Sequence, residues 1–267
     1  MDARTDGGRT DEDAVVSLSG VYKVYELGEP VPVLDDVSLD VPRGSYVSIM
    51  GPSGSGKSTL LNLIGCLDTP TAGEIRIDGT NVTKLSDAER ADVRGTKIGF
   101  IFQTFNLMPR LTALENVAMP LAFRDVSRDE RTQRAKSLLA DVGLEDRLDH
   151  KPTELSGGQR QRVAVARALV NDPAIILADE PTGSLDSETS RQIMRLLEEL
   201  YDRGNTILMV THERDIAEHA ERIVHVLDGE IERIEELGGQ RRIPSVDEAG
   251  SVTNAGDETP EGEAWTS

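Results

Sequence analysis

Alternating apolar and polar residues dominate the first part of the chain. The alternation at 15–18 and again at 37–41 predicts strands that bury one face. Turn residues follow at 42–44, where the sequence is Pro-Arg-Gly, and at 78–79, where it is Asp-Gly. This pattern predicts an antiparallel sheet.

The rest of the folded region has a different pattern, in which buried strands alternate with helices. Residues 47–50 predict a strand that runs into a glycine-rich loop, and 58–67 predict a buried helix after that loop. The short apolar runs 174–178 and 206–210 are bounded by turns and indicate central parallel strands. Residues 110–170 are rich in Ala, Arg, Leu and Glu and predict helices. Such an alternation indicates an α/β core.

Both ends of the chain are polar and acidic and have no hydrophobic periodicity. We therefore expect residues 1–13 and 239–267 to be disordered, with Trp265 as a solvated residue of the tail. One folded unit, 14–238, is expected between them, with a helical subdomain at about 104–170.

Composition argues against several classes of protein. The 267 residues carry a formal charge of −19, whereas a nucleic-acid-binding domain needs a basic surface. No apolar run approaches the ~20 residues of a membrane span, and the first residues contain no apolar core of a signal peptide. We therefore expect a cytosolic protein whose link to a membrane comes through a partner. The single cysteine, Cys66, lies in an apolar stretch and is expected to be a buried, unreactive thiol.

The most specific local pattern is a phosphate-binding loop between the strand at 47–50 and the helix after it. Glycines let successive backbone N–H groups turn toward one anion, and the helix N-terminus adds a partial positive charge. A lysine supplies a mobile charge for the β- and γ-phosphates, and the hydroxyl after it can ligate Mg²⁺. A glycine-rich turn without function is disfavoured because every position of the pattern is filled. The predicted nucleotide-binding residues are Gly51, Pro52, Ser53, Gly54, Ser55, Gly56, Lys57, Ser58 and Thr59.

A second pattern places two carboxylates at the end of a buried strand. Asp179 and Glu180 follow the apolar run 175–178, and ligands of α/β proteins bind at this edge of the sheet. We expect Asp179 to hold Mg²⁺ and Glu180 to orient the attacking water. The alternative is a strand that ends in solvated acids, which the neighbouring phosphate loop disfavours.

A third pattern is the segment 155–159, Leu-Ser-Gly-Gly-Gln, which precedes a helix with one apolar face. Ser156 and the two glycines after it stand at the start of that helix, where they favour a cap and an anion-binding turn. The pattern alone is also compatible with a capped helix of no further function. A second anion site in a chain that already has a phosphate loop requires its own explanation.

Together these patterns resemble those of ABC ATPases over nearly the whole folded unit, with 155–159 as the ABC signature. The resemblance implies a P-loop NTPase (RecA-like) α/β core with an antiparallel β subdomain and an α-helical signature subdomain. It also implies further site residues: Gln103 as the Q-loop contact of Mg²⁺ and water, Asp186 as the D-loop carboxylate, His212 as the switch histidine at the γ-phosphate, and Tyr25, with Tyr22 as a weaker candidate, as the ring that stacks on adenine.

The resemblance implies a mechanism as well. Two copies pack head to tail, and each ATP lies between the phosphate loop of one copy and the signature of the other. Lys57, Mg²⁺ and His212 meet the charge on the γ-phosphate, and Glu180 and Gln103 complete the catalytic set. The signature residues that act on the other copy's nucleotide are Ser156, Gly157, Gly158 and Gln159. Closure on ATP would drive a separately encoded integral membrane permease, with the chain at the cytoplasmic face of the membrane.

A narrower resemblance, to the ATPases of macrolide export and lipoprotein release, is visible at 61–68, 99–103, 107–117 and 179–183. ATPases of ABC importers are the main alternative, because they differ chiefly in their permease. Soluble ABC ATPases of DNA repair or translation usually carry coiled-coil insertions or two cassettes, which this sequence does not show.

The segment 105–109, Phe-Asn-Leu-Met-Pro, carries apolar side chains in a loop-like stretch after Gln103. In the resembled family this region receives the coupling helix of the permease. Two hypotheses stay open for these residues: contact with a permease, and packing inside the helical subdomain itself.

Overall fold

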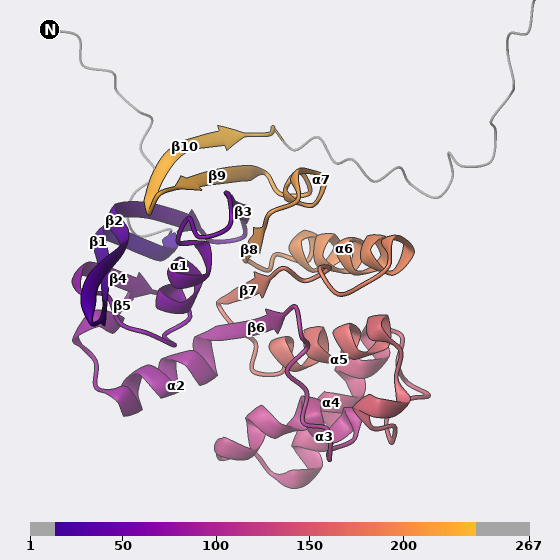
Figure 1. Ribbon diagram of the computed structural model, residues 1–267. Helices are drawn as coiled ribbons and strands as arrows, with labels where there is room; N and C mark the ends of the chain where they lie inside the picture. The colour runs from indigo at the N-terminus through magenta and orange to yellow at the C-terminus, as the bar shows by residue number, and fades with distance from the viewer. Residues whose placement is uncertain (1–13, 239–267) are drawn as a thin grey trace, which may run out of the picture.

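The computed structural model describes residues 14–238, which form two sheets and a helical lobe (Figure 1). The ends predicted to be disordered, 1–13 and 239–267 with Trp265, lie outside the described residues. The strands are β1 (Ala14–Leu27), β2 (Glu29–Pro42), β3 (Tyr46–Met50), β4 (Ala72–Ile77), β5 (Thr80–Asn81), β6 (Ile98–Phe102), β7 (Ile175–Asp179), β8 (Ile207–Thr211), β9 (Arg222–Leu227) and β10 (Glu230–Glu236). The α-helices are α1 (Lys57–Ile64), α2 (Asp87–Lys97), α3 (Ala113–Ala118), α4 (Arg128–Asp141), α5 (Gly157–Leu169), α6 (Ser187–Asp202) and α7 (Arg214–Ala217). The 3₁₀ helices are η2 (Val82–Lys84), η3 (Met119–Phe123) and η4 (Pro152–Glu154).

The first sheet is antiparallel and has the strand order β2-β1-β4-β5. β1 and β2 form a long hairpin, and the other edge of β1 pairs with β4. Val16 and Leu18 on β1 are buried, and they pack in one hydrophobic cluster with side chains of α1. The structure confirms the antiparallel sheet expected from the alternation at 15–18 and 37–41.

The second sheet is mainly parallel and has the order β10-β9-β3-β8-β7-β6, with β10 antiparallel at one edge. Successive residues of a strand point to opposite faces. On β7, Ile175 and Leu177 pack in the cluster that contains α1, whereas Ile176 and Ala178 pack in the cluster that contains α3 to α6. Because both faces are covered, the central strands appear in the sequence as continuous apolar runs. The expected α/β core is confirmed.

The helix α1 is shorter than the helix predicted at 58–67, because it ends at Ile64 and is capped by Gly65. A Cβ on Gly65 would lie 2.4 Å from Phe100 Cζ, and the next residue, Cys66, has a left-handed φ of 54°. The apolar run therefore continues past the helix as a tightly packed turn. The Cys66 thiol is buried, as expected from the sequence, and burial raises its pKa to about 11.

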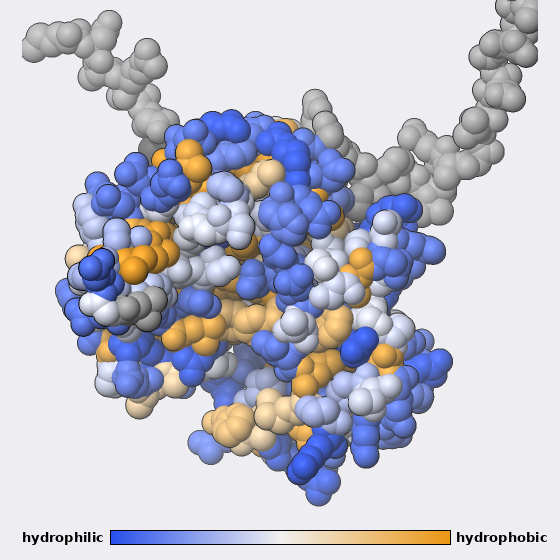
Figure 2. Space-filling model, viewed as in Figure 1, coloured by the Kyte–Doolittle hydropathy of each residue, from blue (hydrophilic) through white to orange (hydrophobic). Residues whose placement is uncertain are grey.

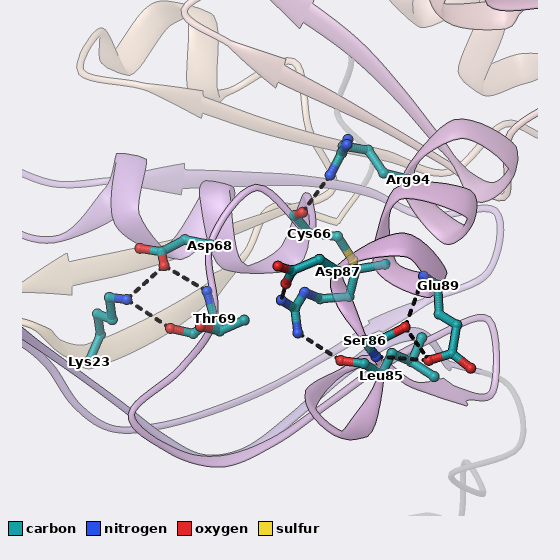
Figure 3. A network of polar contacts seen from close by, with 10 residues as sticks. Lys23, Cys66, Asp68, Thr69, Leu85, Ser86, Asp87, Glu89 and Arg94 are labelled. Carbon is teal, nitrogen blue, oxygen red and sulfur yellow. Dashed lines mark hydrogen bonds and ion pairs between the residues drawn. The ribbon is translucent and has the colours of Figure 1, made fainter. Parts of the chain in front are cut away.

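Polar contacts fix this turn to α2 (Figure 3). Arg94 Nη1 donates to the Cys66 carbonyl oxygen at 2.9 Å. α2 begins with a capping box, in which Glu89 N–H donates to Ser86 Oγ and Ser86 N–H donates to Glu89 Oε2. The capping box thus gives hydrogen-bond acceptors to backbone N–H groups at the N-terminus of α2. Arg94, in the last turn of α2, attaches the helix to the segment after α1.

The helical lobe of α3, α4 and α5 lies beside the edge strand β6 (Figure 1). Asn116 on α3 is fully buried. Its side chain accepts from Met108 N–H at 2.7 Å and donates to the Leu111 and Thr112 carbonyl oxygens, so it holds the loop that enters the lobe. Among residues 14–238, the structure contains no helix with the length and apolar character of a membrane span.

Candidate site for nucleotide binding and hydrolysis

The phosphate-loop segment runs from the end of β3 to the first turn of α1. Gly54 and Gly56 have left-handed φ values of 83° and 100°, which let the backbone turn around a central point. A Cβ on Gly56 would lie 2.9 Å from the Val33 carbonyl oxygen, and one on Gly51 would lie 2.1 Å from the Val226 carbonyl oxygen. The loop is therefore packed closely between β2 and β9.

A cleft of about 530 Å³ opens at this loop. Lys57 is only 8% exposed, and its Nζ donates to the carbonyl oxygens of Gly51 at 2.9 Å and Pro52 at 2.8 Å. The ammonium group thus stands at the loop, where it can meet the charge of a phosphate. The residues that line the cleft are Val33, Ser53, Gly54, Gly56, Lys57, Ser58, Thr59, Glu180 and His212. Of these, Val33 is absent from the residues predicted from the sequence, while the predicted Ser55 is buried.

Asp179 and Glu180 stand at the carboxyl end of β7, on the same edge of the sheet as the phosphate loop. Burial raises the pKa of Asp179; the charge of Glu180 adds to this effect and that of Lys57 opposes it. Glu180 has a left-handed φ of 43°, and its N–H donates to the Val210 carbonyl oxygen at 2.9 Å. This bond attaches the turn that begins at Glu180 to β8.

Two further predicted residues lie beside Glu180. His212 follows β8, and its Nδ1 is 2.8 Å from Glu180 Oε1. Gln103 follows β6 and lies against Gly183: a Cβ built there would be 2.6 Å from Gln103 Nε2 and 3.3 Å from Glu180 Oε2. The ends of β6, β7 and β8 therefore bring these side chains to the turn 180–183.

The predicted adenine-stacking residue, Tyr25, belongs to a polar cluster that sequence reasoning missed. Tyr25 Oη donates to Asp68 Oδ2 at 2.8 Å, and Lys23 Nζ lies 4.6 Å from the centroid of the tyrosine ring. Lys23 Nζ also donates to Asp68 Oδ1 and to the Thr69 carbonyl oxygen (Figure 3). Burial raises the pKa of Asp68, but hydrogen bonds from its neighbours outweigh this effect and hold the pKa below its ordinary value. The cluster fixes the ring of Tyr25; the weaker candidate, Tyr22, is 37% exposed.

The signature segment forms the N-terminus of α5. Ser156 is the N-cap: its Oγ accepts from Gln159 N–H at 3.2 Å, and Gln159 Oε1 accepts from Ser156 N–H at 2.9 Å. Both residues belong to a capping box, which confirms the cap expected at Ser156. No signature residue is among the described residues that line the cleft at the phosphate loop.

The signature glycines pack against the D-loop segment of their own chain. A Cβ on Gly157 would lie 3.1 Å from Leu185 Cδ2, and one on Gly158 would lie 2.4 Å from Thr189 Cγ2. Asp186 is the N-cap of α6, and the N–H of Thr189 makes the main contribution to lowering the pKa of its carboxyl group. These glycines therefore allow the close approach of α5 and α6.

The fold and the cleft are those of an ATP-binding cassette. Residues 34–183, more than half of the chain, match the family model described as ABC transporter, and the chain belongs to that family, as an ABC ATPase. An uncharacterized ABC transporter ATP-binding protein of Thermotoga maritima is 53% identical over 225 residues, which are 84% of this chain and 96% of that protein.

Two further relatives support the narrower resemblance and the fold. The macrolide export ATP-binding/permease protein MacB of Escherichia coli is 51% identical over 226 residues, 84% of this chain and 35% of that protein. The cassette MJ0796 of Methanocaldococcus jannaschii, solved as a dimer in a post-hydrolysis state bound to ADP and Pi, has a TM-score of 0.77 and 52% identity, covering 83% of this chain and 98% of its own. The resemblance to macrolide-export ATPases and the predicted fold class are thereby confirmed.

Proposed function

We propose that the chain hydrolyses ATP as a dimer with a second copy of itself and drives a separately encoded integral membrane permease from the cytoplasmic face of the membrane. The observation that carries the hydrolytic part is the convergence of Lys57, Glu180 and His212 on one cleft. The similar MJ0796 cassette, solved as a dimer with ADP and Pi, supports the same chemistry.

The dimer follows from the placement of the signature. The N-terminus of α5 has the partial positive charge that attracts a phosphate, yet its residues do not line their own chain's cleft among the described residues. A second copy packed head to tail would bring Ser156 and Gly158 to the γ-phosphate. Each site is then complete only in the dimer.

The residues also fit Mg²⁺. The predicted ligands offer a hydroxyl from Ser58, a carboxylate from Asp179 and an amide oxygen from Gln103, and such oxygen donors suit this hard cation. Mg²⁺ held by these residues would neutralise the negative charge that develops during phosphoryl transfer.

The chain's own residues divide the remaining work. Glu180 orients and polarises the attacking water, and its contact with His212 Nδ1 at 2.8 Å fixes the two side chains relative to each other. Lys57 meets the charge of the β- and γ-phosphates. Catalysis is positioning and electrostatic stabilisation, with no covalent intermediate on the protein.

Asp68 is expected to support nucleotide binding through Tyr25. Replacing Asp68 with asparagine removes the charge that pairs with Lys23 and weakens the hold on the tyrosine hydroxyl, so the ring loses its fixed orientation. We expect the affinity for ATP to fall about threefold to tenfold, which corresponds to roughly 1 kcal/mol, the usual net contribution of one hydrogen bond. Fluorescence titration with an ATP analogue measures it; Asp87→Asn, an exposed aspartate on α2, is the control. Equal affinities for the two variants would contradict this role.

Two hypotheses were stated for residues 105–109 in the loop after β6: contact with a permease, and packing inside the helical subdomain. Phe105 is buried, and the Arg160 guanidinium lies 4.9 Å from its ring centroid. Arg167 donates to the carbonyl oxygens of Phe105 and Asn106. The Phe105 side chain is therefore packed against the lobe, whereas Met108 is 47% exposed.

The exposed apolar surface of the helical lobe is our candidate contact with the permease. Figure 2 shows a hollow between α2 and the helical lobe, and apolar surface on the lobe where it borders this hollow. Met108 and Phe123, which is 85% exposed, are the large apolar residues of the lobe most open to solvent among those described. Apolar surface of this kind is typical of a docking site.

Met108→Glu should therefore uncouple the motor from its permease. We expect basal ATP hydrolysis to stay within about twofold of the unmodified chain, because the side chain is exposed, and the stimulation by the permease to fall at least about fivefold. Ile234→Glu on β10 is the matched control, since Ile234 is 45% exposed and lies outside the lobe. ATPase assays with and without reconstituted permease measure both; unchanged stimulation in Met108→Glu would contradict the proposed surface.

The permease itself provides the test of the function as a whole. The chain should co-purify from detergent-solubilised membranes with a protein that contains membrane-spanning helices, and that protein should stimulate ATP hydrolysis. A permease with few spans and a large extracytoplasmic domain would support the macrolide-export type, and one that works with a substrate-binding protein would support the importer alternative. A chain found only in the soluble fraction would contradict the proposal.

A further inference from the structure

Gln161 on α5 is a fully buried polar residue that the proposed cycle does not use. Its Nε2 donates to the Pro181 carbonyl oxygen at 2.6 Å. Its Oε1 is buried and has no hydrogen-bond partner among the described residues. An amide with an unpaired buried acceptor is less favourable for stability than an apolar side chain of the same size. Packing alone therefore does not explain a glutamine at this position.

The carbonyl group that Gln161 binds belongs to the turn that carries Glu180. Within this turn, Glu180 N–H donates to the Val210 carbonyl oxygen at 2.9 Å, and Gly183 N–H donates to the Glu180 carbonyl oxygen at 3.0 Å. Glu180 itself has a left-handed φ, which costs energy for a residue with a side chain. The turn thus needs outside support, and Gln161 supplies it from the helical lobe.

The helix α5 also contacts the chain beyond this turn. Its first residues, Gly157 and Gly158, pack against Leu185 and Thr189. A Cβ built on Gly157 would lie 3.1 Å from Leu185 Cδ2, and one built on Gly158 would lie 2.4 Å from Thr189 Cγ2. One face of α5 therefore contacts the chain between 181 and 189 at three places, and Gln161 binds the residue that directly follows Glu180. A displacement of α5 must be accommodated at the turn of Glu180.

We propose that Gln161 is a positioning residue for Glu180. Through Gln161, the signature helix α5 sets the orientation of the Glu180 carboxylate in its own chain. The donated hydrogen bond sets the Pro181 peptide, and this peptide sets the direction in which the Glu180 side chain leaves the turn. The inference rests on the proposed hydrolytic role of Glu180. It adds a link within one subunit to the contact that the signature makes with the other.

Gln161→Met tests the donor with little change in volume. We expect kcat for ATP hydrolysis to fall about tenfold, because a misaimed base lowers the rate of the chemical step. KM for ATP should stay within about twofold, and the thermal midpoint should change by a few degrees at most. Gln192→Met, at an exposed glutamine of α6, is the matched control and should retain the unmodified kcat. An unchanged kcat in Gln161→Met, or a rise in KM alone, would overturn the proposal.

Gln161→Glu supplies a second readout and decides the matter if the methionine variant does not fold. A protonated carboxyl group can donate its O–H to the Pro181 carbonyl oxygen, whereas a carboxylate cannot, and burial raises the pKa of such a group. The ratio of kcat for this variant to that of the unmodified chain should therefore rise severalfold from pH 8 to pH 6. A ratio independent of pH would overturn the positioning role. If Glu180→Gln hydrolysed ATP normally, the proposed role of Glu180 in hydrolysis would fail instead, so the two failures are distinguishable.

Discussion

Glu180→Gln should lower ATP turnover by at least about 100-fold and leave ATP binding intact. Glutamine has nearly the same shape as glutamate, so the contact with His212 at 2.8 Å and the cleft should persist. The amide cannot accept a proton from the attacking water, and loss of a general base of this kind typically costs 10²–10⁴ in rate. Phosphate release under single-turnover conditions measures the effect, and nucleotide titration measures the binding.

A charge-matched variant separates this effect from a change in net charge. Glu145→Gln alters an exposed glutamate of the helical lobe, and its turnover should equal that of the unmodified chain. Rates in Glu180→Gln that match those in Glu145→Gln would remove Glu180 from its assigned role, and the assignment of His212 would lose its main support.

Lys57→Met should weaken the affinity for ATP about 100-fold. Lys57 is the lysine that lines the cleft, and its ammonium can form charge-assisted hydrogen bonds to the β- and γ-phosphates, each worth roughly 1.5–3 kcal/mol. Loss of one such bond near the upper end of this range corresponds to the stated change, since 1.4 kcal/mol is a factor of ten. Equilibrium titration with radiolabelled ATP measures it.

The control for the lysine is Lys84→Met, a change at an exposed residue that pairs with Glu74. Its ATP affinity should match that of the unmodified chain, as should the thermal midpoint of both variants within a few degrees. Lys57 also donates to two carbonyl groups of the loop. If Lys57→Met bound ATP as tightly as Lys84→Met, the cleft at the phosphate loop would not be the nucleotide site.

Sequence reasoning gave its most specific predictions where the chemistry lies in one contiguous segment. The phosphate loop at 51–59, the carboxylate pair after β7 and the capped signature helix are each read from neighbouring residues whose geometry is set by the local backbone. The predicted helix at 58–67 was too long because Gly65, packed against Phe100, ends α1 while the apolar pattern continues.

Some missed elements had local signals. The hairpin of β9 and β10 turns at Asp228-Gly229, a dipeptide that favours such turns. α2 begins with Ser86 and carries Glu89 three residues later, which is the pattern of a capping box. α2 has no buried residue, so it lacks the apolar periodicity on which the other helix predictions rest.

The contacts that orient the site had no local signal. Tyr25 is fixed by Asp68, 43 positions away, and Gln161 binds Pro181, 20 positions away. Such pairs depend on how α5 and the antiparallel sheet pack against the second sheet. The local patterns of a single sequence do not reveal that packing. Motifs therefore name the candidate reacting groups, while the tertiary structure is needed to identify the residues that orient them.

The central claim, that each nucleotide is held by two copies, is tested most directly by the mass of Glu180→Gln in sedimentation equilibrium. With saturating Mg²⁺ and ATP, the account predicts twice the chain mass of 29.1 kDa, and with ADP it predicts the monomer. Adding Ser156→Arg, which places a bulky side chain at the contact between copies, should restore the monomer while ATP remains bound. A monomer of Glu180→Gln with ATP bound would contradict the account.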